Sequence, residues 1–223
     1  MTATTVNYKS VFDIIGPIMI GPSSSHTAGA VAIGKAAREV YRDDPTKIVI
    51  HYYESFAETH KGHGTDYAII SGILGFAPDD ARVPDAVNIA EERGISVSFI
   101  EEQTDSPIHH PNTAVVELSN DKHAIELSGC SIGGGTIEVR NIKMEGYDIS
   151  PTGTLPVILA IFKTPEDQDK FNKDLAEMSI INKTQKYLGS QRKDMLLEYE
   201  LDTRLKADQI KALSALTDEM IYM

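Results

Sequence analysis

The order of the expected elements over residues 155–223 limits this part of the chain to few folds. Strand-like runs and amphipathic helical patterns follow one another there, at 155–162, 165–178, 180–188, 195–201, 207–216 and 220–223. The second and fifth of these segments are the helices, so the order is βαββαβ, which is that of a ferredoxin-like unit. The sequence therefore predicts a C-terminal domain of this topology over residues 151–223.

The first 150 residues show a different, mixed pattern. Helical spacing of apolar residues predicts helices at 27–41, 67–76 and 84–94. Alternating or β-branched runs predict strands at 47–53, 96–101, 113–118, 122–127 and 136–143. The segment 145–153 carries two glycines and Pro151, which is typical of a linker. We therefore predict an α+β protein, with a mixed α/β domain over residues 1–150 before the ferredoxin-like domain.

Composition excludes several classes of function. The formal net charge of −12 disfavours binding to nucleic acid, whose phosphates would be repelled. No apolar run approaches the ~20 residues that cross a bilayer, and the polar N-terminus lacks the apolar core of a signal peptide. A cytoplasmic protein without a membrane partner is the resulting expectation.

A run of polar residues precedes the first predicted helix: Ser23, Ser24, Ser25, His26 and Thr27. The backbone N–H groups at a helix start, together with the helix dipole, favour a carboxylate, a phosphate or a developing oxyanion. One Ser or Thr would suffice to cap the helix, whereas five polar residues exceed that need. We therefore predict a functional site at this helix start.

Two further polar stretches lie downstream. In the cluster from Glu58 to Asp66, Gly62 and Gly64 flank His63, so we expect unusual backbone that leaves the His63 imidazole uncovered. We expect His60 and Lys61 in a solvated loop, and Asp66 either caps the next helix or orients His63.

The third polar stretch, His110 to Asn112, forms a loop that leads into a strand. Beyond the following hairpin, the glycines at 133–135 predict a tight bend that a ligand can reach.

The string from Gly21 to Gly29 resembles the signature of the iron–sulfur-dependent L-serine dehydratases, in the β subunit of the version made as two chains. Ala30 stands where that family usually has proline. The stretch from His63 to Asp66 resembles a second motif of the catalytic pocket, and His110 to Asn112 resembles a separate, allosteric serine site. Together these matches extend over residues from about 20 to 135. The resemblance thus implies catalytic roles for Ser24, Ser25, His26, Thr27, His63, Thr65 and Asp66, and serine binding by Ser23, His110, Asn112, Gly133 and Gly134.

Dehydration of L-serine needs a base for the α-proton, donors for the carboxylate and a Lewis acid for the hydroxyl. The first two polar clusters supply all of these except the metal. Cys130 is the only cysteine and cannot by itself hold an iron–sulfur cluster. The resemblance therefore implies a partner α subunit that carries a [4Fe-4S] cluster, with pyruvate and ammonia as products. Either His26 or His63 can be the base, and we favour His63.

The C-terminal domain resembles an ACT domain, the small amino-acid-sensing module. ACT domains usually have a glycine in the turn after the first strand, and the turn from Lys163 to Asp167 has none. That departure favours a structural or dimerising role, with a β–β homodimer as one arrangement.

Three other functions compete with a dehydratase subunit. A Ser–His hydrolase is disfavoured because Ser25 and His26 are adjacent and this serine run is not set in a Gly-x-Ser-x-Gly elbow. A non-catalytic module that senses an amino acid at the His110 loop is the second. A mononuclear metal site made by His60, His63 and Asp66 is the third, although Lys61 sits unfavourably beside a cation.

Overall fold

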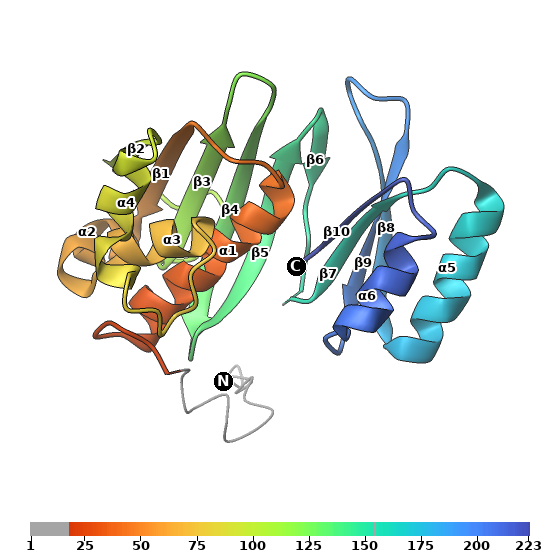
Figure 1. Ribbon diagram of the computed structural model, residues 1–223, viewed down its shortest axis with the longest axis horizontal. Helices are drawn as coiled ribbons and strands as arrows, with labels where there is room; N and C mark the ends of the chain where they lie inside the picture. The colour runs from red at the N-terminus through yellow and green to blue at the C-terminus, as the bar shows by residue number, and fades with distance from the viewer. Residues whose placement is uncertain (1–17, 154) are drawn as a thin grey trace.

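The computed structural model of the protein describes residues 18–153 and 155–223. Within these residues the strands form a six-stranded and a four-stranded sheet, which lie side by side (Figure 1). The six-stranded sheet has the order β2-β1-β3-β4-β5-β6, with β1 and β2 parallel and the other pairs antiparallel. Its strands are β1 (Lys47–Tyr53), β2 (Ser96–Glu101), β3 (Thr113–Ser119), β4 (Ala124–Gly133), β5 (Thr136–Met144) and β6 (Tyr147–Ile149).

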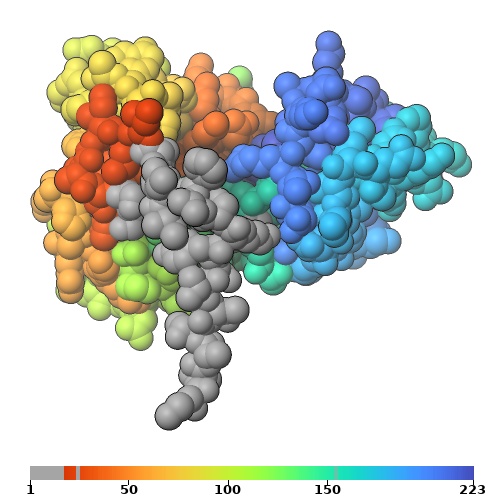
Figure 2. Space-filling model, turned by 90° about the horizontal axis from the view of Figure 1, so that it is seen from below, coloured from red at the N-terminus to blue at the C-terminus, as the bar shows by residue number. Residues whose placement is uncertain are grey.

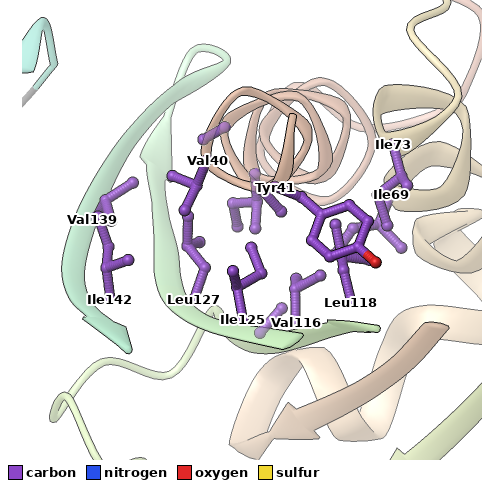
Figure 3. Packing of buried hydrophobic residues seen from close by; sticks show 14 of the residues in the cluster. Val40, Tyr41, Ile69, Ile73, Val116, Leu118, Ile125, Leu127, Val139 and Ile142 are labelled. Atoms are coloured by element: carbon purple, nitrogen blue, oxygen red, sulfur yellow. The ribbon is translucent and has the colours of Figure 1, made fainter. Parts of the chain in front are cut away.

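Helices cover one face of the six-stranded sheet. In chain order they are the π-helical turn η2 (Ser24–Ala28), α1 (Gly29–Tyr41), α2 (Glu54–His63), α3 (Thr65–Ile73), the 3-10 turn η3 (Val83–Asp85) and α4 (Ala86–Glu92). Successive side chains of a strand point to opposite faces of the sheet, and only one face is covered by helices. In β1, Ile48, Ile50 and Tyr52 are therefore fully buried, while His51 is only half-buried. Figure 3 shows Val40 and Tyr41 of α1 packed over Val116, Leu118, Ile125 and Leu127 of the sheet.

The four-stranded sheet is antiparallel, with the order β10-β7-β9-β8. Its elements are β7 (Val157–Ile161), α5 (Pro165–Met178), β8 (Ile181–Leu188), β9 (Met195–Leu201), α6 (Ala207–Ser214) and β10 (Glu219–Tyr222). Thr164 caps α5 by accepting a hydrogen bond from the Asp167 N–H, and Phe171 and Leu175 turn the apolar face of that helix to the sheet. The βαββαβ prediction and its ferredoxin-like topology are confirmed.

The two sheets share part of one hydrophobic core. Val157 and Leu159 of β7 and Ile221 of β10 belong to the same buried cluster as α1 and the six-stranded sheet. Arg192 adds polar contacts, because it pairs with Glu145 of the first sheet's last turn and with Glu219 of β10. In the space-filling view, the red segment that begins at Ile18 and the blue C-terminal residues occupy opposite sides of the same face (Figure 2).

Two sequence predictions about the fold are wrong. His60 and Lys61 lie in helix α2 (Glu54–His63) rather than in a solvated loop, and Phe56 and His60 are buried at the i, i+4 spacing of one helix face. The expected linker at 145–153 contains β6, which pairs with β5 through Tyr147, Asp148 and Ile149. The other expected elements are present, with ends shifted by a few residues. The expected 1–150 domain begins with 17 residues that lie outside the described ranges.

Helices α1 and α3 cross at a distance that only glycine allows. A Cβ on Gly34 of α1 would lie 2.0 Å from the Ile69 carbonyl oxygen, and one on Gly72 of α3 would lie 2.1 Å from the Val31 carbonyl oxygen. Both obstacles are backbone atoms, which cannot rotate away as a side chain can. The two helices are therefore in direct backbone contact.

We expect Gly34→Ala to lower the free energy of unfolding by about 1–3 kcal/mol, because the added methyl must push the helices apart. Urea unfolding of the isolated chain measures this loss. Gly62→Ala is the matched control, since no atom lies within 4 Å of its Cβ position in α2. That variant should be more stable by about 0.5–1 kcal/mol. Equal effects of the two substitutions would contradict the close crossing.

Candidate functional site

The serine-rich stretch forms the first turn of the helix rather than a loop before it. The turn η2 is π-helical and continues directly into α1. Ser23 caps it, because its Oγ accepts from the His26 N–H at 3.1 Å and its carbonyl accepts from the Thr27 N–H at 2.9 Å. Single π-helical turns occur frequently at functional sites. Ser23 thus has the capping role, and the backbone of Ser24 and Ser25 lies within the turn. The side chains of these two serines lie outside what the structure describes.

His26 lies between two serine hydroxyls. Its Nδ1 is 3.2 Å from the Ser23 Oγ, and its Nε2 is 3.4 Å from the Ser55 Oγ of α2. The ring also packs on Phe56, with 5.3 Å between ring centroids, and burial lowers the pKa of His26 below its ordinary value. The nearby His63 lowers the pKa further. The neutral imidazole is therefore favoured at position 26.

Thr27 joins the first two polar motifs. Its Oγ1 donates a hydrogen bond to the His63 carbonyl at 3.0 Å, and its side chain is fully buried. The His26 and His63 rings meet edge to face with 4.7 Å between their centroids. Residues 36 positions apart in the chain are thus brought into one cluster.

His63 is held in a fixed position rather than on flexible backbone. It is the last residue of α2, and Gly64 ends that helix in the left-handed conformation, with φ of 69°. A Cβ on Gly64 would lie 2.1 Å from the Tyr67 ring, so this position needs glycine. The Nδ1 of His63 and the Oγ1 of Thr65 are buried without a hydrogen-bond partner in the described part of the chain. Buried polar atoms without a partner are uncommon in proteins.

Asp66 does not contact His63 as the sequence suggested. Its Oδ1 lies 2.6 Å from the Nδ1 of His60, which is buried and not in a solvated loop. The Nε2 of His60 lies 3.0 Å from the Glu101 Oε1 of β2, to which Lys61 also donates at 2.7 Å. His60 therefore has one carboxylate oxygen within hydrogen-bonding distance of each ring nitrogen. Asp66 and His60 thus brace α2 against α3 and β2, and the prediction that Asp66 caps α3 is also wrong.

The third polar stretch packs against the start of helix α2. The Pro111 carbonyl accepts from the Phe56 N–H at 3.3 Å, directly beside Ser55 and its contact with His26. The His110 Nδ1 accepts from the Asn112 N–H at 3.1 Å, and burial, followed by the charge of Arg140, lowers the pKa of His110. The loop thus lies against the start of α2, next to the serine that contacts His26.

Asn112 connects this loop to β4. Its carbonyl accepts from the Ser131 N–H at 3.0 Å, and its side-chain amide donates to the Ser131 carbonyl at 3.4 Å. The glycines that follow form the predicted bend between β4 and β5, with φ of 102° at Gly133 and 62° at Gly134. Sequence reasoning missed both Ser55 and Ser131. Ser55 belongs to no recognisable motif, and the Gly-x-Ser-x-Gly string around Ser131 lies in strand β4 and not in a strand-to-helix turn.

The residues present do not fit an iron–sulfur cluster. Cys130 is fully buried in β4, and burial raises its pKa to about 11, which keeps it a thiol rather than the thiolate that binds iron. Over the described ranges, no group of three or more His, Cys, Asp or Glu side chains is placed to hold a metal ion. The alternative of a metal site made by His60, His63 and Asp66 is therefore contradicted. No helix in the same ranges has both the length and the apolarity to cross a membrane.

We expect the acid stability of the protein to depend on Glu101. Hydrogen bonds from Lys61 and from His60 lower the pKa of Glu101 from 4.5 to about 2. Because the pKa is lower in the folded state, the stabilisation is complete above about pH 4.5 and is lost as the pH falls towards 2. Urea unfolding should therefore show Glu101→Gln less stable than wild type at pH 7, with the difference shrinking below pH 4.5. Glu92→Gln, at an exposed position of α4, is the control. A difference that stays constant down to about pH 2 would contradict this assignment.

Comparison with known proteins places these features in a family. The sequence profile of the family described as "Serine dehydratase beta chain" matches residues 10–141. The "Probable L-serine dehydratase, beta chain" of Bacillus subtilis (strain 168) is 42% identical over 218 residues, which is 95% of each chain. The "L-serine dehydratase, beta chain" of Peptoniphilus asaccharolyticus is 40% identical over 151 residues, 67% of each chain.

A longer relative matches in part. "L-serine dehydratase 2" of Escherichia coli (strain K12) is 33% identical over 151 residues, which cover 57% of this chain but only 33% of that protein. The assignment rests on two findings. The Bacillus beta chain matches over nearly its full length, and the family profile matches as well. The chain belongs to the serine dehydratase beta chain family and is a subunit of a lyase, L-serine dehydratase.

Proposed function

We propose that this chain supplies the acid–base and carboxylate-binding half of a site that converts L-serine to pyruvate and ammonia. The observation that carries the proposal is the cluster of His26 and His63 at the start of α1, with the Nδ1 of His63 buried and unpartnered. A fixed imidazole with a free nitrogen suits a group that must remove a proton near neutral pH.

The reaction divides naturally between two chains. Loss of the α-proton and of the β-hydroxyl as water gives an aminoacrylate, which tautomerises to an imine and hydrolyses to pyruvate and ammonia. The residues of this chain can hold the carboxylate and take the proton. Because the chain does not fit an iron–sulfur cluster, we propose that a partner α chain carries a [4Fe-4S] cluster. The beta-chain names of the Bacillus and Peptoniphilus relatives support such a partner.

Within this half-site, His63 is the proposed base and His26 a hydrogen-bond donor to the substrate carboxylate. The hydrogen bond from Thr27 to the His63 carbonyl holds the backbone of His63 and so restricts the position of the His63 imidazole. Both ring nitrogens of His26 already lie near serine hydroxyls, and its lowered pKa favours a neutral ring that donates from one nitrogen. The buried hydroxyl of Thr65 is a further ligand contact. Ser24 and Ser25 keep the roles that the family resemblance implies.

Asp66 and Thr27 act through other residues in this proposal. Thr27 holds His63, and Asp66 holds His60, so both position the half-site rather than react with the substrate. We propose that Ser23 takes part in L-serine binding at the half-site, beside His26. His110, Asn112, Gly133 and Gly134 belong, in this proposal, to a second, regulatory L-serine site. The contact of Asn112 with the strand that leads to the glycine bend supports their grouping.

We further propose that residues 151–223 form an ACT-like domain that can join two beta chains, after a first domain over residues 1–150. The strand order β10-β7-β9-β8 supports the first point. The shared core between the two sheets shows that the two parts are packed together and not tethered by a free linker. A pure amino-acid sensor remains the competing function, and calorimetry of L-serine with the chain alone and with the α chain separates the two.

In the assembled enzyme, His63→Ala should lose roughly 10²–10⁴-fold in turnover, which is the usual contribution of a general base. His26→Ala should mainly raise the serine concentration for half-maximal rate. Exchange of the α-proton with deuterated solvent identifies the base directly. If His63→Ala exchanges at the wild-type rate while His26→Ala does not, the two roles are reversed.

The isolated chain should remain colourless after anaerobic treatment with iron and sulfide, and it should not act on L-serine. Co-expression with the α chain should give the visible absorption of a cluster, and Cys130→Ala should not reduce that absorption. Its thiol is buried and protonated, so it is not a ligand. A stable cluster on the isolated chain would contradict the assignment of the metal to the partner.

A further inference from the structure

Ser55 brings a hydroxyl from helix α2 to the half-site. Its Oγ lies 3.4 Å from the Nε2 of His26, 29 residues away in the chain, and its side chain is half-buried. An ordinary N–H···O hydrogen bond measures about 2.7–3.2 Å, so this contact is loose. The described part of the chain offers the Ser55 hydroxyl no hydrogen-bond partner other than His26. Both groups can therefore turn toward a third group that enters the half-site.

The His26 ring is held from its other edge. Its Nδ1 lies 3.2 Å from the Ser23 Oγ, and the ring packs on Phe56 with 5.3 Å between the centroids. The Ser23 Oγ accepts from the His26 backbone N–H at 3.1 Å, and a hydroxyl that accepts in this way still has a hydrogen that can reach Nδ1. These contacts turn the Nε2 edge of the ring toward Ser55. In a neutral imidazole whose Nδ1 accepts, the single N–H is at Nε2.

The backbone just before Ser55 is strained. Glu54 follows strand β1 directly and has φ of 47°, in the left-handed region that residues other than glycine seldom occupy. Its Oε1 accepts from the Ser106 N–H at 3.1 Å, which helps to hold this conformation. Strained residues of this kind gather at active sites and ligand contacts, where the surrounding structure holds them. Here the sharp turn from strand to helix places Ser55 in the first turn of α2, beside His26.

We propose that the Ser55 hydroxyl and the His26 Nε2–H form a two-donor fork for the α-carboxylate of L-serine. This inference rests on the proposed dehydratase function and adds Ser55 to the residues that touch the substrate. Two donors so close together can each reach one oxygen of a single carboxylate. A neutral donor pair also avoids a positive charge beside His63, whose nearness already lowers the pKa of His26.

The first test measures the rate of the assembled enzyme against L-serine concentration. Ser55→Ala should raise the half-saturating concentration about 10- to 100-fold, the usual contribution of a hydrogen bond to a charged group. The saturated rate should change much less, because the carboxylate is bound equally before and during the reaction. Ser55→Thr keeps the hydroxyl and should restore the wild-type serine dependence. An unchanged half-saturating concentration in Ser55→Ala would overturn the proposal.

Thr59→Ala is the matched control. Thr59 lies one turn later in α2, and its hydroxyl donates to the Ser55 carbonyl at 2.5 Å. Loss of that hydroxyl loosens the helix near Ser55 but removes no donor from the fork. The half-saturating concentration should therefore stay close to that of wild type. A rise as large as that in Ser55→Ala would show that Ser55 acts only through the helix, and the fork would be rejected.

Analogues identify the substrate group that the fork binds. L-alanine keeps the carboxylate but lacks the β-hydroxyl, so it should compete with L-serine without being dehydrated. L-alaninamide carries a neutral amide in place of the carboxylate. Ser55→Ala should weaken inhibition by L-alanine about 10- to 100-fold and inhibition by L-alaninamide much less. Equal weakening of the two, or no competition by L-alanine in wild type, would contradict a carboxylate fork.

Nitrogen-15 NMR of the labelled full-length chain tests the fork without turnover. The Nδ1 of His26 should show the chemical shift of an unprotonated acceptor and the Nε2 that of an N–H, with the resonances assigned by comparison with His26→Ala. A proton on Nδ1 in the neutral ring would overturn the proposal. If this tautomer is present but the assembled wild type does not turn over L-serine, the proposed function fails instead.

Discussion

The structure depends on how closely helix α1 approaches its neighbours. Glycines stand at the contacts on both sides of this helix: Gly34 and Gly72 where it crosses α3, and Gly29 and Gly129 where it faces β4. With side chains at these positions the helix would stand away from the sheet, and the cluster of Ile33, Val40 and Tyr41 would lose its packing. The same approach brings the serine-rich turn within reach of His63 on one side and of Ser131 on the other. The close approach of α1 to its neighbours is therefore needed both for the packing of the hydrophobic core and for the assembly of the candidate site.

The surroundings of the histidines differ. His60 lies between two carboxylates, one near each ring nitrogen, and these contacts join α2 to α3 and β2. His26 and His63 lie against each other and against apolar or neutral groups, so a second positive charge there is unfavourable. The fold thus separates a histidine bound between carboxylates from two whose rings face each other. Sequence spacing alone, with His60 and His63 three residues apart, does not reveal this division.

Local sequence patterns were sufficient to predict most helices and strands of the fold. The strands at 47–53, 96–101 and 195–201 and the helix at 165–178 have the bounds that periodicity predicts. Helix α2 was missed because its sequence is polar, and its burial rests on only Phe56 and His60. The burial of His60 depends in turn on Glu101, 41 residues away, which no local pattern contains. For the site, the motif residues were found from sequence, but Ser55 and Ser131 are positioned by tertiary contacts alone.

Helix α1 also links the candidate site to the four-stranded sheet. Its first residue contacts Ser131, and beyond its last turn Arg42 adopts a left-handed conformation and donates to Glu219 of β10 at 3.2 Å. Glu219 is also paired with Arg192, which holds Glu145 at the end of the six-stranded sheet. Helix α1 thus extends from the serine-rich turn at one end to the contact with β10 at the other.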